Sequence, residues 1–316
     1  MRKITKNYKA YAKVNLFLDV TEKLSNGYHN IKSIMQEVSL CDDISISVTL
    51  SEIPTECEIS VICNNTDNIP CNENNIAWKA ADMLLKAFGT GKYFTSSIHI
   101  EITKNIPSPG GLGGGSADCA AVLNALNDMF ELNLDISTLM DLGVKIGADV
   151  PFCIQGGTAA VEGIGEIVRP ISLNYPKNCC FVIANAGIGM PTPLAFGLLD
   201  DKFDNFSLDK YINGTNPLFA FENVVDAVKK GCYNDICKCT YNIFEDIIKS
   251  VRPEIQKIFD ILSSNGADTC FLSGSGPSVV GMFTDKIKLL NTMDALSSAG
   301  IRCWSCRPVT KYPSII

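Results

Sequence analysis

Apolar and polar residues alternate in the first third of the chain with the period of a β-strand. Residues 44–50 read Ile-Ser-Ile-Ser-Val-Thr-Leu, and residues 98–102 read Ile-His-Ile-Glu-Ile. Successive side chains of a strand point to opposite faces of a sheet, so this pattern predicts two strands that each bury one face. His99 falls on the polar face of the second strand, where we expect it to meet solvent.

Helical spacing of apolar residues occurs in three nearby segments. Residues 74–88 predict a helix that ends at Gly89, because glycine readily takes the left-handed conformation that closes a helix. Residues 116–130 predict a second helix with Ser116 as its N-cap. Residues 136–146 predict a third, which ends before Gly147.

The remaining sequence mixes short strands with helices, which indicates an α+β fold. A polar segment, residues 200–216, predicts a surface loop. A boundary near residue 160 would divide the chain into an N-terminal domain, residues 1–160, and a C-terminal domain, residues 161–316. The further strands are predicted at residues 158–168, 181–184, 269–272 and 279–283, and the further helices at residues 217–231, 243–248 and 253–264.

Composition excludes several classes of protein. With 46% hydrophobic and 19% charged residues, the 316-residue chain resembles ordinary globular proteins. It has no apolar run of about 18 residues and no secretory signal pattern, so we expect a cytoplasmic protein that does not bind membranes. A net charge of −7 without a Lys/Arg cluster argues against nucleic acid as a partner.

The 14 cysteines lie scattered among apolar segments, and we expect most of them to be buried free thiols. The C-x-x-C pattern at Cys303 and Cys306 has no second pair at the spacing that structural zinc sites use. The sequence therefore assigns no metal ligands.

A glycine-rich segment carries the strongest functional signal. Residues 107–121 read Pro-Ser-Pro-Gly-Gly-Leu-Gly-Gly-Gly-Ser-Ala-Asp-Cys-Ala-Ala, with five glycines among residues 110–115. Glycines let backbone N–H groups approach an anion closely, and the following helix N-terminus adds donors and the positive end of a dipole. The segment lacks the Lys-Ser/Thr of a Walker A loop and the G-x-G-x-x-G of a dinucleotide fold. It predicts a phosphate-binding loop of another kind, and the flanking prolines and helix disfavour a flexible linker.

This loop resembles the P-x-x-x-G-L-G-G-G-S-x-x-A-A signature of the GHMP kinases, the galactokinase, homoserine, mevalonate and phosphomevalonate kinase superfamily. Residues 11–16, Tyr-Ala-Lys-Val-Asn-Leu, resemble its N-terminal motif, and residues 272–278, Leu-Ser-Gly-Ser-Gly-Pro-Ser, its C-terminal glycine-rich loop. The resemblance implies a two-domain GHMP kinase fold, with a ribosomal-protein-S5-like N-terminal domain and a ferredoxin-like C-terminal domain, and ATP with Mg²⁺ as cofactor. It implies that ATP contacts Pro107, Ser108, Pro109, Gly110, Gly111, Leu112, Gly113, Gly114, Gly115, Ser116, Ala117, Lys104 and Asn75, with Gly274, Ser275 and Gly276 beside the phosphates.

Residues 26–29, 147–152 and 191–193 are similar to the branch that phosphorylates the 2-hydroxyl of 4-diphosphocytidyl-2-C-methyl-D-erythritol, a step towards isoprenoid precursors by the non-mevalonate route. The resemblance implies a small-molecule substrate with a cytidine diphosphate moiety. It places the cytosine between Tyr28 and Phe196 and lets His29 read its edge. Asn15 and Thr192 complete the implied substrate contacts.

Two polar residues suit the chemistry that the resemblance implies. A tertiary alcohol is a poor nucleophile near neutral pH, so a carboxylate within hydrogen-bond reach can take its proton as the bond to phosphorus forms. Asp149 is the implied base, and the Lys13 ammonium would favour its ionised form and stabilise the attacking oxygen. From the residues alone, Asp149 could equally be a helix N-cap and Lys13 a solvated strand residue.

Two other functions remain open at this point. A related small-alcohol kinase, of the homoserine or mevalonate type, would not need the aromatic pair around a cytosine. An inert nucleotide-binding protein is suggested only by Ala117, which stands where the family loop usually has a second serine. The presence of Lys13 and Asp149 argues against this last possibility.

Overall fold

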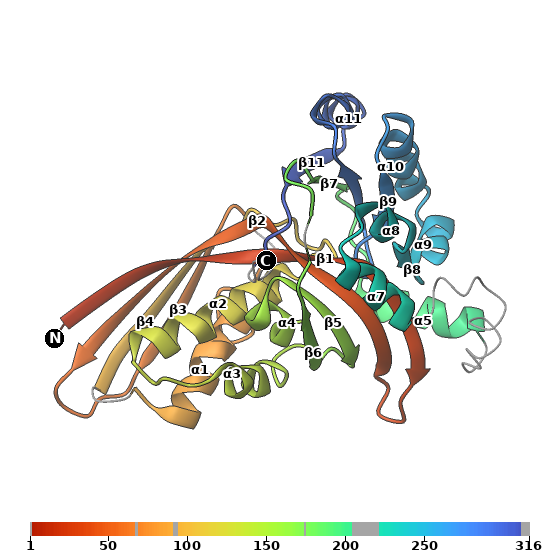
Figure 1. The fold of residues 1–316 in the computed structure, drawn as a ribbon. Helices are drawn as coiled ribbons and strands as arrows, with labels where there is room; N and C mark the ends of the chain where they lie inside the picture. The colour runs from red at the N-terminus through yellow and green to blue at the C-terminus, as the bar shows by residue number, and fades with distance from the viewer. Residues whose placement is uncertain (1, 67–68, 91–93, 174, 204–220, 311–316) are drawn as a thin grey trace. The chain divides into compact units, whose positions relative to one another are not determined.

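The computed structural model describes residues 2–66, 69–90, 94–173, 175–203 and 221–310 (Figure 1). Two compact units make up the chain. The first comprises residues 1–12, 41–106 and 113–155, and the second comprises residues 13–40, 107–112 and 156–316. The units are not consecutive in sequence because two long strands, β1 (Arg2–Lys23) and β2 (His29–Ser51), each run through both. The domain boundary near residue 160 stays a prediction; the last crossing between units lies at residues 155–156.

The first unit places helices against a sheet, as Figure 1 shows. Its sheet contains β3 (Glu58–Asn64), β4 (Phe94–Thr103) and the second half of β2. β2 and β4 are antiparallel, with Ile46 opposite Ile100, and β3 pairs with β4 in parallel. The helices of this unit are α1 (Ile76–Phe88), α2 (Gly114–Met129), α3 (Ile136–Gly143) and α4 (Val150–Gln155).

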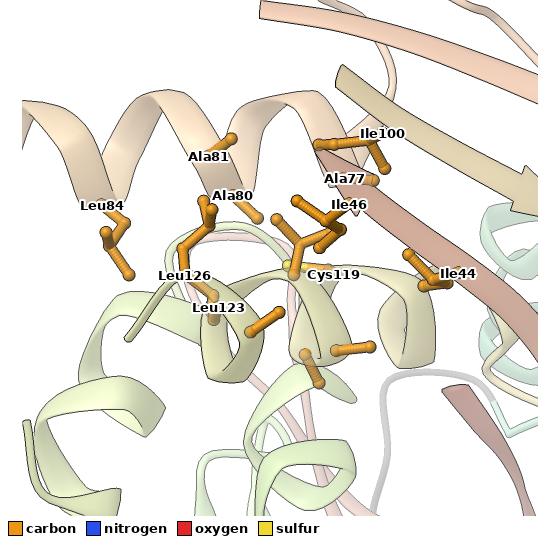
Figure 2. Close-up of a cluster of buried hydrophobic side chains, with 14 of the residues drawn as sticks. Ile44, Ile46, Ala77, Ala80, Ala81, Leu84, Ile100, Cys119, Leu123 and Leu126 are labelled. Carbon is orange, nitrogen blue, oxygen red and sulfur yellow. The ribbon is translucent and has the colours of Figure 1, made fainter. Parts of the chain in front are cut away.

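The core of the first unit forms where the apolar face of the sheet meets α1 and α2 (Figure 2). The alternating isoleucines of β2 and β4 are at most 1% exposed. Helix α1 contributes small residues and Leu84, and α2 contributes Leu123 and Leu126. The two strands predicted from alternation are therefore confirmed. His99 lies on the other face of β4, half-buried, and its Nδ1 hydrogen-bonds the Ser60 hydroxyl (2.9 Å).

The second unit contains an antiparallel sheet in the order β11-β7-β10-β9. It also contains the first half of β2, which pairs with β5, and the second half of β1, which pairs with β8 in parallel. Its strands are β5 (Thr158–Gly163), β6 (Ile167–Ile171), β7 (Cys180–Asn185), β8 (Tyr241–Asn242), β9 (Thr269–Leu272), β10 (Ser278–Phe283) and β11 (Arg302–Cys306). Its helices are α5 (Thr192–Phe203), α7 (Phe221–Lys230), α8 (Tyr233–Lys238), α9 (Glu245–Val251), α10 (Pro253–Ser264) and α11 (Lys286–Ser298).

A second core packs helices against this antiparallel sheet. Val182 of β7, Leu272 of β9 and Val279 of β10 are fully buried against side chains of α5, α9, α10 and α11. The strands predicted at residues 158–168, 181–184, 269–272 and 279–283 are thus present, with a turn at residues 164–166 that separates β5 from β6. The predicted mixture of helices and strands is confirmed.

One predicted loop is partly wrong. Residues 200–203 were expected to begin a surface loop but form the last turn of α5, because Ala195 and Leu199 on this helix are buried in the core of the second unit. Residues 204–216 of the predicted loop lie outside the described residues.

Two expectations from composition can be compared with the structure. Within the described ranges, no helix combines the length and apolar character needed to cross a membrane. The cysteines are free thiols, but Cys119, Cys179, Cys239 and Cys306 alone are fully buried, and most of the others are half-buried. The expectation that most of them would be buried was wrong.

Candidate active site

Helix α2 begins directly at the glycine-rich segment. Its N-cap is Gly113, in the left-handed conformation (φ 67°), and no side chain caps the helix. Ser116 therefore lies in the first turn, and its predicted role as N-cap was wrong, because Gly114 and Gly115 already take helical conformations. Because Gly113 has no side chain that could cap α2, the first turn offers N–H donors and a positive dipole end to an anion.

The first half of the glycine-rich segment packs against the C-terminal glycine-rich loop within the second unit. Gly111 has a φ of 69°, and the Ser273 hydroxyl donates a hydrogen bond to its carbonyl oxygen (3.0 Å). A Cβ on Gly111 would overlap the carbonyl oxygen of Ser273 and lie 3.0 Å from that of Gly276. Two segments separated by about 160 residues thus touch through their backbones, and only glycine fits at this position.

The N-terminal motif on β1 joins both loops in the second unit. The Lys13 N–H donates to the Leu112 carbonyl (2.9 Å), and the Lys13 ammonium donates to the Asn15 Oδ1 (2.8 Å). The same Asn15 oxygen accepts the N–H of Gly274 (3.1 Å), while its Nδ2 donates to the Ser33 hydroxyl (2.8 Å). Lys13 and Asn15 are 4% and 1% exposed, so Lys13 is not a solvated strand residue. The three motifs that the sequence placed far apart meet here.

Asp149 lies in the first unit, directly before α4, and is half-buried. Its carbonyl accepts the N–H of Cys153 (3.1 Å), which fixes the backbone of this turn. Two residues earlier, Gly147 approaches the first turn of α2: a Cβ there would lie 3.7 Å from the Ser116 hydroxyl. The segment that carries the predicted base is therefore next to the N-terminus of α2.

The residues expected to hold a cytosine lie in the second unit. Tyr28 is 58% exposed, whereas His29 is 8% exposed. The rings of His29 and Phe196 stack at 4.6 Å between centroids, and Phe196 meets Phe244 edge-on at 4.9 Å. Helix α5 thus brings Phe196 onto the His29 ring, a stack that the resemblance did not imply, and the roles of Tyr28, His29 and Phe196 towards a cytosine stay predictions. At the start of the same helix, the hydroxyls of Thr192 and Ser275 share a hydrogen bond (3.2 Å).

Sequence reasoning missed Asp200, which it placed in a loop. One turn after Phe196 on α5, Asp200 binds the Nε2 of His29 (2.8 Å) and the ammonium of Lys23 (2.5 Å). Burial opposes the charge on Asp200, but the hydrogen bonds from Lys23 and His29 outweigh it and hold the pKa of this carboxyl below its usual range. The spacing of four residues from Phe196 was the available signal, but it has meaning only once residues 192–203 are known to be helical.

Two other residues that the resemblance implied to contact ATP have side chains that bind neighbouring residues within the first unit. Asn75 caps α1 by accepting the N–H of Ala77 (2.8 Å), and its Nδ2 donates to the carbonyl of Pro70 (2.8 Å). The Lys104 ammonium is ion-paired with Asp42 and with Asp118 (2.6 Å). Their contacts with ATP stay predictions.

Asp42 and Asp118 were not expected as functional residues. Both are buried, and Asp118 lies inside the glycine-loop signature, two residues after Ser116. Single-sequence patterns do not distinguish a buried aspartate from one on a helix surface, so no earlier signal pointed to the ion pairs with Lys104.

Known proteins support this assembly of motifs. The sequence profile of the GHMP kinases N terminal domain matches residues 75–157, and that of the GHMP kinases C terminal matches residues 224–302. The 4-diphosphocytidyl-2-C-methyl-D-erythritol kinase of Caldicellulosiruptor bescii is 38% identical over 288 residues, which cover 91% of this chain and 93% of that protein. The kinase of the same name from Lachnoclostridium phytofermentans is 36% identical over 278 residues, 88% of each chain.

Solved structures agree with these sequence matches. A crystal structure of 4-(cytidine 5′-diphospho)-2C-methyl-D-erythritol kinase superposes with a TM-score of 0.71 at 26% identity, covering 95% of this chain and 98% of the other. The L. major mevalonate kinase, solved with R-mevalonate, superposes with a TM-score of 0.73 at 16% identity over 98% of each chain, which shows a shared fold. The expected two-domain GHMP kinase fold is confirmed. The chain belongs to the GHMP kinase family.

Proposed function

We propose that the protein transfers the γ-phosphoryl group of ATP to the 2-hydroxyl of 4-diphosphocytidyl-2-C-methyl-D-erythritol, giving the 2-phosphate and ADP. The observation that carries this proposal is the similarity to relatives of that name along about nine-tenths of the chain. The aromatic residues at Tyr28, His29 and Phe196 support the same substrate, because a homoserine or mevalonate kinase has no cytosine to bind.

The glycine-rich segment would hold the ATP phosphates. The uncapped first turn of α2 supplies N–H donors, and the contacts of Gly111 with the 273–276 loop shape the other half of the segment. ATP is the donor on which the family depends. A turn with several exposed backbone N–H groups is well suited to bind the phosphates of ATP.

Asp149 and Lys13 would carry out the transfer. Asp149 would accept the proton of the substrate 2-hydroxyl while the oxygen of that hydroxyl forms a bond to the γ-phosphorus. The bond between the γ-phosphorus and the β,γ-bridging oxygen breaks, and ADP leaves. The ammonium of Lys13 stabilises the negative charge that develops on the attacking oxygen. Burial strengthens this interaction, since Lys13 is 4% exposed.

Magnesium would accompany ATP as the family's usual partner. In the described part of the chain, no group of three or more His, Cys, Asp or Glu residues is placed to hold a metal ion. Mg²⁺ generally keeps several waters and needs few protein ligands when it binds with a nucleotide, so it would enter together with ATP. Bound with ATP, it would neutralise part of the charge of the transferred group.

A coupled assay of ADP release tests the substrate. The purified protein is supplied with ATP and Mg²⁺ and with the diphosphocytidyl alcohol, homoserine or mevalonate in parallel. We expect turnover with the diphosphocytidyl alcohol far above that with the other two. Preference for either smaller alcohol would replace the proposed substrate, and failure to turn over any of them with nucleotide still bound would indicate an inert nucleotide-binding protein.

Replacing Tyr28 with alanine should raise the KM for the diphosphocytidyl substrate by about 5- to 100-fold, because stacking on one base contributes about 1 to 3 kcal/mol. The KM for ATP should change little, since the stack serves the cytosine alone. Steady-state kinetics with each substrate varied in turn measures both constants. Phe88→Ala, at an exposed aromatic on α1, is the matched control and should change neither. Equal effects of Tyr28→Ala on the two constants would make Tyr28 part of the scaffold.

A further inference from the structure

Three buried charged side chains form an ion cluster in the first unit, beside the N-terminus of α2. The Lys104 ammonium, just after β4, binds the Oδ2 of Asp42 on β2 and the Oδ2 of Asp118 on α2 (2.6 Å). All three side chains are at most 6% exposed. A Cβ on Gly114, the first residue of α2, would lie 3.6 Å from the Lys104 nitrogen. The cluster therefore borders the turn that would hold the ATP phosphates.

The two carboxylates of this cluster are not equivalent. The Oδ1 of Asp42 accepts the N–H groups of Asn105 (2.6 Å) and Ile106 (2.8 Å), and its Oδ2 accepts Lys104, so both oxygens of Asp42 have donors. The Oδ1 of Asp118 is buried and has no hydrogen-bond partner among the described residues. A buried carboxylate oxygen without a donor is costly when it is charged. Any proton that the cluster takes up therefore belongs on Asp118.

Among the described residues, two thiols also interact with Asp118, and neither supplies a positive charge. Cys63 at the end of β3 and Cys119 on α2 both interact with Asp118, and burial raises the pKa of each thiol above its usual value, so both stay neutral. The buried side chains of α1, among them Ala77, are apolar, and α4 buries Val150 and the uncharged amide of Gln155. Two carboxylates thus share one ammonium, which leaves a net charge of −1 when both are ionised.

We propose that Asp118 is a proton-binding residue of the nucleotide site, which takes up a proton when ATP binds. This inference rests on the proposed binding of ATP at α2. With both carboxylates ionised, the cluster repels the phosphates, whereas a proton on the Asp118 Oδ1 makes the cluster neutral. Asp118 acts as a positioning residue, because it acts on ATP through the charge of the cluster and through Lys104.

The ionisation expected for Asp118 makes this coupling relevant near neutral pH. Burial raises the pKa of Asp118 to about 7, although Lys104 acts in the opposite direction. Burial also opposes the charge on Lys104, but Asp118 and Asp42 outweigh it and keep the pKa of Lys104 above its usual value, so Lys104 stays charged. An anion bound nearby favours neutral Asp118 and raises its pKa further. Binding of ATP therefore weakens as the pH rises through the pKa of Asp118 in the free protein.

Isothermal titration of the full chain with the β,γ-imido analogue of ATP and saturating Mg²⁺ tests the proposal. Titrations at about pH 7.5 in two buffers of different ionisation enthalpy give the number of protons exchanged, and we expect an uptake of about one half to three quarters of a proton, because about one quarter of the free protein already carries it. The dissociation constant should be about tenfold higher at about pH 8.5 than at about pH 6.5. No proton uptake, or an affinity that does not fall with pH, would overturn the proposal.

Asp118→Asn separates this effect from other titrations, because asparagine keeps an oxygen for Lys104 and cannot be ionised. It should bind the analogue without proton uptake and should lose the fall in affinity at high pH. Asp128→Asn is the matched control: Asp128 lies on the same helix and pairs with Lys6, but its side chain is 60% exposed. This control should behave like the unsubstituted protein. A pH dependence that persists unchanged in Asp118→Asn would refute the assignment.

A direct measurement covers the case in which Asp118→Asn does not fold. Carbon-13 NMR of the unsubstituted protein, with labelled aspartate side chains, should show one buried carboxyl carbon shifting to its protonated position when the analogue is added at about pH 7.5. If no carboxyl shifts, the proposal fails. Nucleotide binding without proton uptake removes only the role of Asp118, whereas absence of any nucleotide binding also removes the proposed kinase function.

Discussion

Replacing Asp149 with asparagine should lower kcat by about 10²- to 10⁴-fold, the range in which general base catalysis contributes. Asparagine has nearly the same shape but cannot accept the proton of the 2-hydroxyl. The dissociation constant for the ATP analogue should stay within about twofold, because the N–H groups of α2 hold the phosphates without this carboxylate. Single-turnover phosphoryl transfer and calorimetric binding of the analogue measure the two effects separately.

The control for this substitution is Asp141→Asn, at an exposed aspartate on α3 in the same unit. It should leave kcat unchanged. Activity of Asp149→Asn within a few fold of the unsubstituted protein would exclude Asp149 as the base. Lys13→Met extends the test: because the proposed base and ammonium serve one proton transfer, the double variant should be little slower than the slower single variant.

The substitution Gly111→Ala should disrupt the phosphate-binding segment itself. Gly111 has a φ of 69°, which costs an alanine about 1 to 2 kcal/mol, and the new methyl group would overlap the Ser273 carbonyl oxygen. The two backbones must move apart, so the KM for ATP should rise by at least about tenfold and the melting temperature should fall by several degrees. Kinetics with ATP varied and thermal unfolding followed by circular dichroism measure these effects.

Gly300→Ala distinguishes the overlap from the backbone strain. Gly300 has a similar φ of 75°, but a Cβ there would meet nothing within 4 Å. This control should lower the melting temperature slightly and leave the KM for ATP unchanged. If both variants behave alike, close approach of the 273–276 loop does not matter to nucleotide binding.

Sequence patterns predicted much of the secondary structure correctly because it depends on local periodicity. The isoleucines of residues 44–50 and 98–102 became the facing strands β2 and β4, and residues 253–264 form α10 as predicted. Errors occurred where distant packing decides a boundary. Residues 200–203 look like a polar loop but continue α5, because the buried Ala195 and Leu199 hold this helix against the core.

The candidate site shows the same division. Glycines at residues 110–115 indicated a phosphate cradle because their conformational freedom is a property of the residues themselves. Ser116 as a cap was wrong, since a serine in this position caps a helix only when the preceding glycines are not helical. The motifs around Lys13 and Gly274 were recognised through resemblance, but their hydrogen bonds to Asn15 depend on a fold that brings distant segments together.

The sequence by itself determined the α+β class, the phosphate-binding segment and, through resemblance, the kinase family. The tertiary structure alone decided which charged residues share an environment. Asp200 meets His29 across 171 residues, and Lys104 meets Asp42 across 62. Helices, strands and loops can be predicted from residues that are close in sequence. The ionisation of a carboxyl group depends instead on its burial and on charges that only folding brings beside it.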